Sequence, residues 1–297
     1  MIKKIFSIAI IGSILLTGCK KKDTSDDNNN NNNTTTTTDP YKMSSGDFAE
    51  AGDTVYLATD SVPNDSVGSE GKDQTWDFSN LTIETEQTII YKSPSSYSYG
   101  SDFPDANLAY DQGNGIAVFV NKSSERSEIV GMYGDLTGQG FIVGVNYNPS
   151  QLVYNFPFTY DDSYDNTSGF ETTMAVKEVP ELVALGLDAI ADSFRIKQQN
   201  ILSTNVDAEG SITIPLGTYK AIREYREEVI TDSIFAHFLF GGWMLVPYIQ
   251  GYFEYANPQT FTTKKYIWYA QEIGYPLAEA GIDSLGGVSY ITYVSAK

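Results

Sequence analysis

One stretch of the chain decides the fold: Gly210-Ser211-Ile212-Thr213-Ile214-Pro215-Leu216-Gly217-Thr218-Tyr219-Lys220-Ala221-Ile222-Arg223. Isoleucines alternate with small polar residues before the turn, which is typical of a strand with one buried face. Pro215 restricts φ to about −65° and suits the second position of a turn, whereas Gly217 can adopt a positive φ that bulky residues resist. The stretch therefore predicts a β-hairpin that turns at Pro215 to Gly217.

Further strand signals lie on both sides of this hairpin. Runs rich in β-branched and aromatic residues, bounded by Gly, Pro, Asn or Asp, predict strands. They occupy residues 52–59, 81–91, 116–120, 141–147, 212–214, 219–230, 248–255 and 261–269. The run 219–230 has a composition that also suits a helix and follows neither period cleanly, but the turn before it favours a strand.

One segment, residues 180–191, has a helical pattern. Pro180 suits a first helical turn, and Leu182, Leu185, Ala189 and Ile190 recur on one face. Many strands with a single helix predict an all-β fold of mainly antiparallel strands, built as a curved sheet or a sandwich.

The N-terminus carries an export signal. Lys3 and Lys4 precede an apolar run over 5–16, and Leu16-Thr17-Gly18-Cys19 follows. The run is too short to span a bilayer as a helix, so residues 1–18 are a predicted signal peptide. The tetrapeptide resembles the lipobox of bacterial lipoproteins, which implies cleavage after Gly18 and lipidation of Cys19. Cys19 is the chain's single cysteine, so no thiol is left for a disulfide, a metal or catalysis.

A polar linker, residues 19–40, follows the signal. It contains Asn and Thr tracts and almost nothing apolar to bury, so we expect it to be disordered. Lys20 followed by Asp23, Asp26 and Asp27 resembles the export signal of surface-exposed lipoproteins of Bacteroidota. This implies an outer-membrane protein, lipid-anchored and facing the cell surface. The alternative is a domain that faces the periplasm.

The remaining residues, 41–297, form the predicted globular body. Their number suits one large β domain or two subdomains that divide near 150–180. The chain has 38 acidic and 19 basic residues and a formal net charge of −19. This charge excludes nucleic acid as a partner. We expect contact with the membrane through the lipid anchor at Cys19. The sequence identifies no protein or glycan partner.

Four motifs resemble a family of uncharacterised β-rich secreted and surface proteins of Bacteroidota. They are the 210–223 hairpin, the segment 192–197 before it, the aromatic segment 267–276 after it, and residues 74–81. Relatives often carry a type IX sorting domain, which this sequence lacks, so the lipid is expected to provide the attachment. The resemblance implies a β fold and an envelope location, and it implies no chemistry.

Catalytic chemistry is restricted by the rarity of histidine. His237 is the only histidine, which excludes catalytic sites that need two histidines and His-rich zinc sites. The sequence also has no Gly-rich phosphate loop. We therefore expect no enzymatic activity. A pair of carboxylates could still hydrolyse glycosides, but the sequence does not single out two among 38 acidic residues.

A cluster of carboxylates follows an aromatic run. Asp161, Asp162 and Asp165 have the spacing of the start of a Ca²⁺ loop, and oxygen ligands suit Ca²⁺. Asn166 stands where the turn glycine belongs, so the main interpretation is a solvated acidic turn. No other cofactor is expected.

The segment 234–246 is more apolar than a hairpin with one wet face should be. The favoured interpretation is a pair of strands buried on both faces. The alternative is the lining of a cavity, with Phe238, Phe240, Trp243 and Leu245 as ligand-binding residues, since the chain also resembles periplasmic lipoprotein carriers of the open-barrel type. We expect Trp243 to be exposed because it follows two glycines.

Five Asp-Ser/Thr-apolar tripeptides resemble the O-glycosylation acceptor of Bacteroidota. Their acceptor residues are Thr54, Ser61, Ser66, Ser233 and Ser284. An acceptor must be exposed, so the structure bears on each of them.

Together these features predict a surface-exposed lipoprotein that acts as a non-enzymatic binding or structural module with an unknown ligand. The alternative function is a carrier of hydrophobic ligands in an open, barrel-like cavity. A carboxylate-dependent glycoside hydrolase is the third hypothesis.

Overall fold

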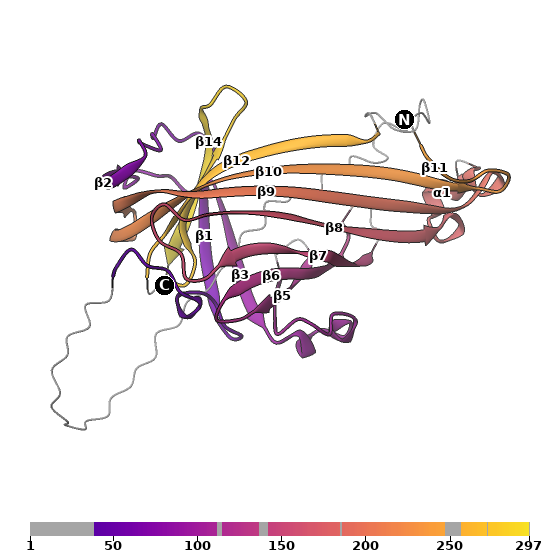
Figure 1. The fold of residues 1–297 in the computed structure, drawn as a ribbon, viewed down its shortest axis with the longest axis horizontal. Coiled ribbons are helices and arrows are strands. Elements are labelled where there is room, and N and C mark those ends of the chain that lie inside the picture. Colours follow the sequence, from indigo (N-terminus) through magenta and orange to yellow (C-terminus); the bar gives the residue numbers. More distant parts are fainter. Residues whose placement is uncertain are drawn as a thin grey trace.

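The computed structural model describes residues 39–111, 115–136, 142–184, 186–246, 257–271 and 273–296. Within these ranges the chain forms one sheet of 14 strands (Figure 1). The all-β prediction is confirmed. Residues 1–18, Cys19, most of the linker and the whole of the expected strand 248–255 lie outside the described residues. Among the described helices, none is long and apolar enough to cross a membrane.

The strands lengthen in the second half of the chain, and β9 and β10 are by far the longest. The bounds are β1 Thr54–Asp60, β2 Gly71–Asp77, β3 Thr85–Lys92, β4 Leu108–Asp111, β5 Ala117–Lys122, β6 Arg126–Gly134, β7 Val143–Asn155, β8 Ser163–Ala175, β9 Ala191–Ile214, β10 Gly217–Phe238, β11 Gly242–Leu245, β12 Gln259–Tyr269, β13 Pro276–Ile282 and β14 Val288–Ala296.

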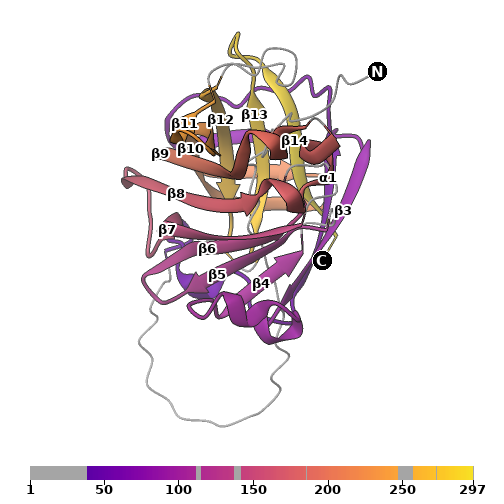
Figure 2. The ribbon, with the colours of Figure 1, turned by 90° about the vertical axis from the view of Figure 1, so that its right-hand side faces the viewer.

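The sheet is a nearly continuous antiparallel path. Its order is β2-β9-β10-β12-β13-β14-β1-β3-β4-β5-β6-β7, with β8 also paired to β9 and β11 to β10. Only the pair of β2 and β9 is parallel among the pairs described. The strands curve so far that β7 and β8 come to lie side by side (Figure 2). They are not joined by a strand ladder in the described residues, so the sheet is open at this seam.

The predicted hairpin turn is present between the two longest strands. Ile214 of β9 pairs with Gly217 of β10, and Gly217 has a φ of 146°. Pairing continues from this turn to the far end, where Ala191 pairs with Phe238, and the register shifts between Arg223 and Glu224 and between His237 and Phe238. The turn and these two shifts together determine which β9 and β10 side chains meet on each face of the sheet.

Most of the core lies inside the curve of the sheet, and part of it is a group of packed aromatic rings. Phe48, Tyr154, Phe156, Phe158 and Tyr269 form a cluster with ring centroids 4.3–6.1 Å apart. The region 150–180, where a division into two subdomains was considered, contains the end of β7 and all of β8. Both strands belong to the same sheet as the rest of the body.

A second, smaller apolar cluster lies at the far end of β9 and β10, where α1 Pro180–Ala184 and β11 are found (Figure 1). The helix is shorter than the predicted 180–191. Gly186 adopts a left-handed conformation with φ 73°, which ends helices readily because glycine has no Cβ, and a 3₁₀ turn Leu187–Ala189 follows. Ala191 already pairs in the sheet, so the last residue of the predicted helix belongs to β9.

Candidate functional site

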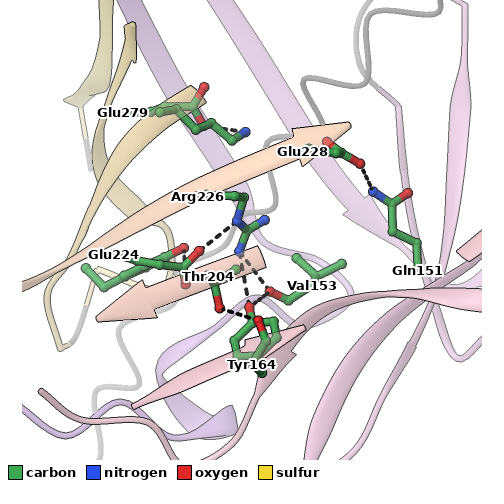
Figure 3. Close-up of polar contacts among 10 residues, drawn as sticks. Gln151, Val153, Tyr164, Thr204, Glu224, Arg226, Glu228 and Glu279 are labelled. Atoms are coloured by element: carbon green, nitrogen blue, oxygen red, sulfur yellow. Dashed lines mark hydrogen bonds and ion pairs between the residues drawn. The ribbon is translucent and has the colours of Figure 1, made fainter. Parts of the chain in front are cut away.

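The face of β8, β9 and β10 that points into the curve carries buried polar side chains. Two neighbouring groups can be distinguished along β10. Figure 3 shows the first group and, from the second, Gln151 and Glu228. The ion-pair cluster consists of Tyr164, Glu224, Arg226, Lys265 and Glu279. The acceptor cluster consists of Tyr147, Gln151, Ser168, Gln198, Asn200, Glu228 and Asp232.

Every charge of the ion-pair cluster has a partner of opposite sign. The Nε of Arg226 donates to Oε1 of Glu224 at 2.7 Å, and its Nη2 donates to the Val153 carbonyl at 3.0 Å. Nζ of Lys265 lies 3.0 Å from Oε2 of Glu279. Burial opposes the charge of Arg226, but the Glu224 carboxylate outweighs it and holds the pKa of the guanidinium well above its usual value. This cluster is neutral and saturated.

The acceptor cluster is assembled by strand register. Ser168 of β8 lies opposite Asn200 of β9, and Gln198 of β9 lies opposite Asp232 of β10. Residues directly opposite one another have Cβ atoms about 4.5–5.5 Å apart. The Nε2 of Gln198 donates to Oδ1 of Asp232 at 2.9 Å.

Two β7 side chains connect to this face. The Nε2 of Gln151 donates to Oε1 of Glu228 at 2.8 Å (Figure 3). The Tyr147 hydroxyl donates to Oε1 of Gln198 at 3.4 Å. All seven residues are buried, and no exposed fraction exceeds the 7% of Tyr147.

Four polar atoms of this cluster have no hydrogen-bond partner among the described residues. They are Oε1 of Gln151, Oγ of Ser168, Oδ1 of Asn200 and Oδ2 of Asp232. A buried polar atom without a partner costs about 1–3 kcal/mol, and each case in a folded protein calls for an explanation. Four of them gather in this cluster, on β7, β8, β9 and β10, which makes it the candidate functional site.

Both carboxyl groups of the acceptor cluster have raised pKa values. Burial raises the pKa of Asp232 to about 6, although the hydrogen bond from Gln198 acts in the opposite direction. Burial also raises the pKa of Glu228, partly offset by the charges of Lys265 and Arg226. Desolvation disfavours the ionised form of a carboxyl, so a nearby positive charge would stabilise both groups.

A third buried charge, on Arg223, has a structural explanation. Its Nε and Nη2 donate to the two carboxylate oxygens of Asp207 at 2.8 and 2.9 Å, and its Nη1 donates to the Val67 carbonyl. The Nε1 of Trp76 donates to the same carbonyl at 2.8 Å. These bonds attach the segment that contains β2 to the long hairpin, which accounts for the tryptophan motif at residues 74–81.

The apolar segment 234–246 forms the end of β10, a turn and β11. Phe238 pairs with Gly242, and both Phe238 and Leu245 are half-buried. Phe240 is 100% exposed, and Leu239 and Met244 are each 48% exposed. The prediction of burial on both faces is therefore wrong at this tip, because the turn lies beyond the small apolar cluster and no described residue covers it.

Trp243 is 37% exposed, which confirms the prediction that this residue is exposed. The guanidinium of Arg195 lies 4.1 Å from its ring centroid, and the His237 ring lies 5.2 Å away. Nδ1 of His237 is 2.9 Å from Oδ1 of Asp192, so this histidine belongs to the lip of the sheet. The role of the apolar tip residues in ligand binding stays a prediction.

The acidic turn uses its carboxylates locally. Oδ2 of Asp162 accepts from the backbone N and the hydroxyl of Thr159, and Asp165 is an exposed residue of β8 opposite Ser203. Asp161 has a φ of 73° and donates its backbone N–H to Val206. Across the described ranges no three His, Cys, Asp or Glu side chains converge in a way that could hold a metal. The Ca²⁺ hypothesis thus stays a prediction without geometric support.

The glycosylation candidates divide into two groups. Ser61, Ser66 and Ser284 are exposed outside strands, as an acceptor must be. Thr54 and Ser233 are half-buried within β1 and β10. Modification of the three loop serines stays a prediction.

The acceptor cluster was missed by the sequence analysis. Its only sequence signal is the alternation of each strand. Gln198 and Asn200 of β9, and Glu228 and Asp232 of β10, occupy the alternate positions that apolar residues occupy elsewhere in the same strand. Polar residues at inward positions look like outward ones in the sequence, so the pattern carries little information about burial.

No family model matches the chain, and no curated protein matches it. Two crystal structures are similar: a candidate lipoprotein from Parabacteroides distasonis, with 10% identity, and a candidate exported protein with a YmcC-like fold from Bacteroides fragilis, with 8% identity. Each alignment covers 82% of this chain and 94% of the other, with a TM-score of 0.28. At this level the likeness carries no argument about the chain.

Proposed function

We propose that the protein is a lipid-anchored envelope protein whose β body is a non-enzymatic binding module for a small polar ligand. The ligand is held by the acceptor cluster inside the curved sheet. The observation that carries the proposal is the set of four buried polar atoms without hydrogen-bond partners among the described residues.

The neighbouring ion-pair cluster supports this interpretation. Its charged residues are equally buried, yet their charges are matched within the fold. A polar network that serves only to hold strands together gains most when it is fully satisfied, because low dielectric surroundings penalise unpaired groups. The acceptor cluster departs from that rule, which a bound polar ligand would explain.

The same geometry favours a polar ligand over hydrophobic cargo. An apolar ligand would leave Ser168, Asn200 and Asp232 without partners, and the apolar candidates Phe240 and Trp243 are exposed at the end of the sheet. A glycosidase is also disfavoured. Glu228 and Asp232 are four residues apart on one strand, about 13 Å along it, whereas paired glycosidase carboxyls lie roughly 5–9.5 Å apart.

The anchor is assigned to Cys19 on the lipobox motif. Asp39, the first described residue, is 20 residues further on, and a flexible chain of that length averages about 25 Å end to end. Cell fractionation tests this part: Cys19→Ser should release the protein from the membrane fraction. Equal retention would contradict the anchor.

Protease added to intact cells should cut within residues 28–38, and complete protection would place the domain in the periplasm.

The binding function is tested without knowledge of the ligand. In Ser168→Ala, a hydroxyl without a partner is removed, so the free energy of unfolding should stay equal or rise by up to about 1 kcal/mol. Ser203→Ala, at an exposed β9 position, is the matched control and should be neutral. A loss above about 1 kcal/mol in Ser168→Ala alone would show that the hydroxyl serves the fold, and the proposal would fail.

Native mass spectrometry of the protein isolated from its own envelope provides the direct readout. We expect a non-covalent small-molecule adduct, which is absent from the spectrum of Asp232→Asn. An adduct-free parent protein would contradict the binding function.

A further inference from the structure

We infer that the acceptor cluster binds a primary ammonium group, so that the ligand is an organic amine in its protonated form. This inference rests on the proposed function and names the chemical class of its ligand.

The first argument is the kind of hydrogen-bonding atom that remains free. Three donor groups of the cluster already have acceptors within it: Nε2 of Gln151 on Glu228, Nε2 of Gln198 on Asp232, and the Tyr147 hydroxyl on Gln198. The atoms without a partner among the described residues are all oxygens: the acceptors of Gln151, Asn200 and Asp232, and the Ser168 hydroxyl, which can accept as well as donate. An ammonium group has three donors and no acceptor, whereas a hydroxyl brings one donor and two lone pairs. The site therefore suits ammonium better than a sugar or an alcohol.

The second argument is charge. Arg226 is matched by Glu224 and Lys265 by Glu279, so the nearby cations are already paired. Neither Glu228 nor Asp232 forms an ion pair with any described residue, although Lys265 and Arg226 act on Glu228 at longer range. Two buried carboxyls without a counter-ion are costly in a medium of low dielectric. One organic cation would compensate this charge and also supply the missing donors.

The third argument separates an ammonium group from a metal ion. Calcium takes six to eight oxygen ligands, often from several carboxylates. The cluster has two carboxylates, four residues apart on one strand, and no described set of three acidic or histidine side chains could hold a metal. Tetrahedral N–H donors directed at separate oxygens fit this arrangement better.

The seam between β7 and β8 gives the ligand a route into the curve. In place of a strand ladder, the two strands are linked by the Leu152 N–H, which donates to Oδ1 of Asn166 at 3.1 Å, and by the Tyr164 hydroxyl, which donates to the Val153 carbonyl at 2.7 Å. Such isolated bonds open locally at lower cost than a continuous ladder.

The test is a nuclear magnetic resonance titration of the purified full chain with propylammonium at pH 7.5, observing the side-chain amide signals of Gln198 and Asn200. 1-Propanol is the neutral analogue, and tetramethylammonium is a cation without N–H donors. We expect saturable shifts with propylammonium and at least tenfold weaker binding of the other two. Asp232→Asn should weaken propylammonium binding at least tenfold, whereas Asp188→Asn, at an exposed position, should not change it.

The outcomes separate this inference from the proposed function. Equal binding of 1-propanol, or an unchanged affinity in a folded Asp232→Asn variant, overturns the ammonium assignment. In that case a co-purifying adduct still supports a polar ligand of another class. If neither propylammonium nor any adduct is found at the site, both proposals fail.

Discussion

Two groups of buried polar residues share the inner face of β10, and they differ in how their charges are matched. Glu224 and Arg226 belong to a cluster in which each charge has a counter-ion, whereas Glu228 and Asp232, only a few residues further along, have none among the described residues. The charged residues of both clusters are buried, at 7% exposure or less. The difference teaches that burial alone does not reveal function. The ion-pair cluster is explained by the fold, whereas the acceptor cluster keeps polar atoms without a partner among the described residues, which is the basis of the proposed binding function.

The largest expected effect comes from breaking the ion-pair cluster. Arg226→Met leaves Glu224 buried without a counter-ion, and removing one partner of a buried pair costs about 3–5 kcal/mol. Urea denaturation should show this loss. Lys264→Met, which removes a partly exposed ion pair with Glu227, is the control and should cost about 1 kcal/mol or less. Equal small effects would mean that the two clusters do not differ as described.

In the acceptor cluster, we expect a substitution to raise the free energy of unfolding instead of lowering it. The pKa of Asp232 is about 6 in the folded protein, above about 3.9 in the unfolded chain, so stability is fully present below pH 4 and is lost as the pH rises through 6. Asp232→Asn removes this penalty and keeps an acceptor for Gln198. We expect a gain of roughly 2 kcal/mol at pH 7.5 and little change at pH 4.

Denaturation at both pH values checks this prediction. The result that contradicts it is a destabilised Asp232→Asn variant at pH 7.5, which would indicate a favourable partner for the carboxylate within the chain.

A comparable or smaller effect is expected at the turn that sets the register of both clusters. Gly217 has a φ of 146°, which is open to glycine and strained for other residues, while a Cβ there would meet only ordinary contacts with Tyr219. Gly217→Val should therefore cost about 1–3 kcal/mol through backbone strain. Gly286→Val, at a positive φ in the distant loop between β13 and β14, should cost a similar amount. Only the Gly217 variant should shift the amide signals of Gln198 and Asn200.

The hairpin was predictable because its turn chemistry is local. Pro215 and Gly217 restrict the backbone whatever surrounds them, and the observed turn confirms them. The helix was predicted too long because Gly186 and the pairing of Ala191 with Phe238 depend on tertiary context.

The candidate site could not be predicted for a related reason. The run 219–230 fits no clean period because Glu224, Arg226 and Glu228 occupy inward positions that are usually apolar. On β9 the inward Gln198 and Asn200 alternate with the outward polar residues Lys197 and Gln199, so polarity does not distinguish the two faces. Only register, which comes from pairing between distant strands, shows that these residues meet.

The central claim is that the acceptor cluster contains carboxyl groups without a counter-ion. Its most direct test is a titration of the Asp232 side-chain carboxyl by ¹³C nuclear magnetic resonance in the ligand-free protein. The account predicts a midpoint near pH 6, as burial without a counter-ion requires. A midpoint at or below about 4, the value of a solvated or ion-paired aspartate, would contradict it.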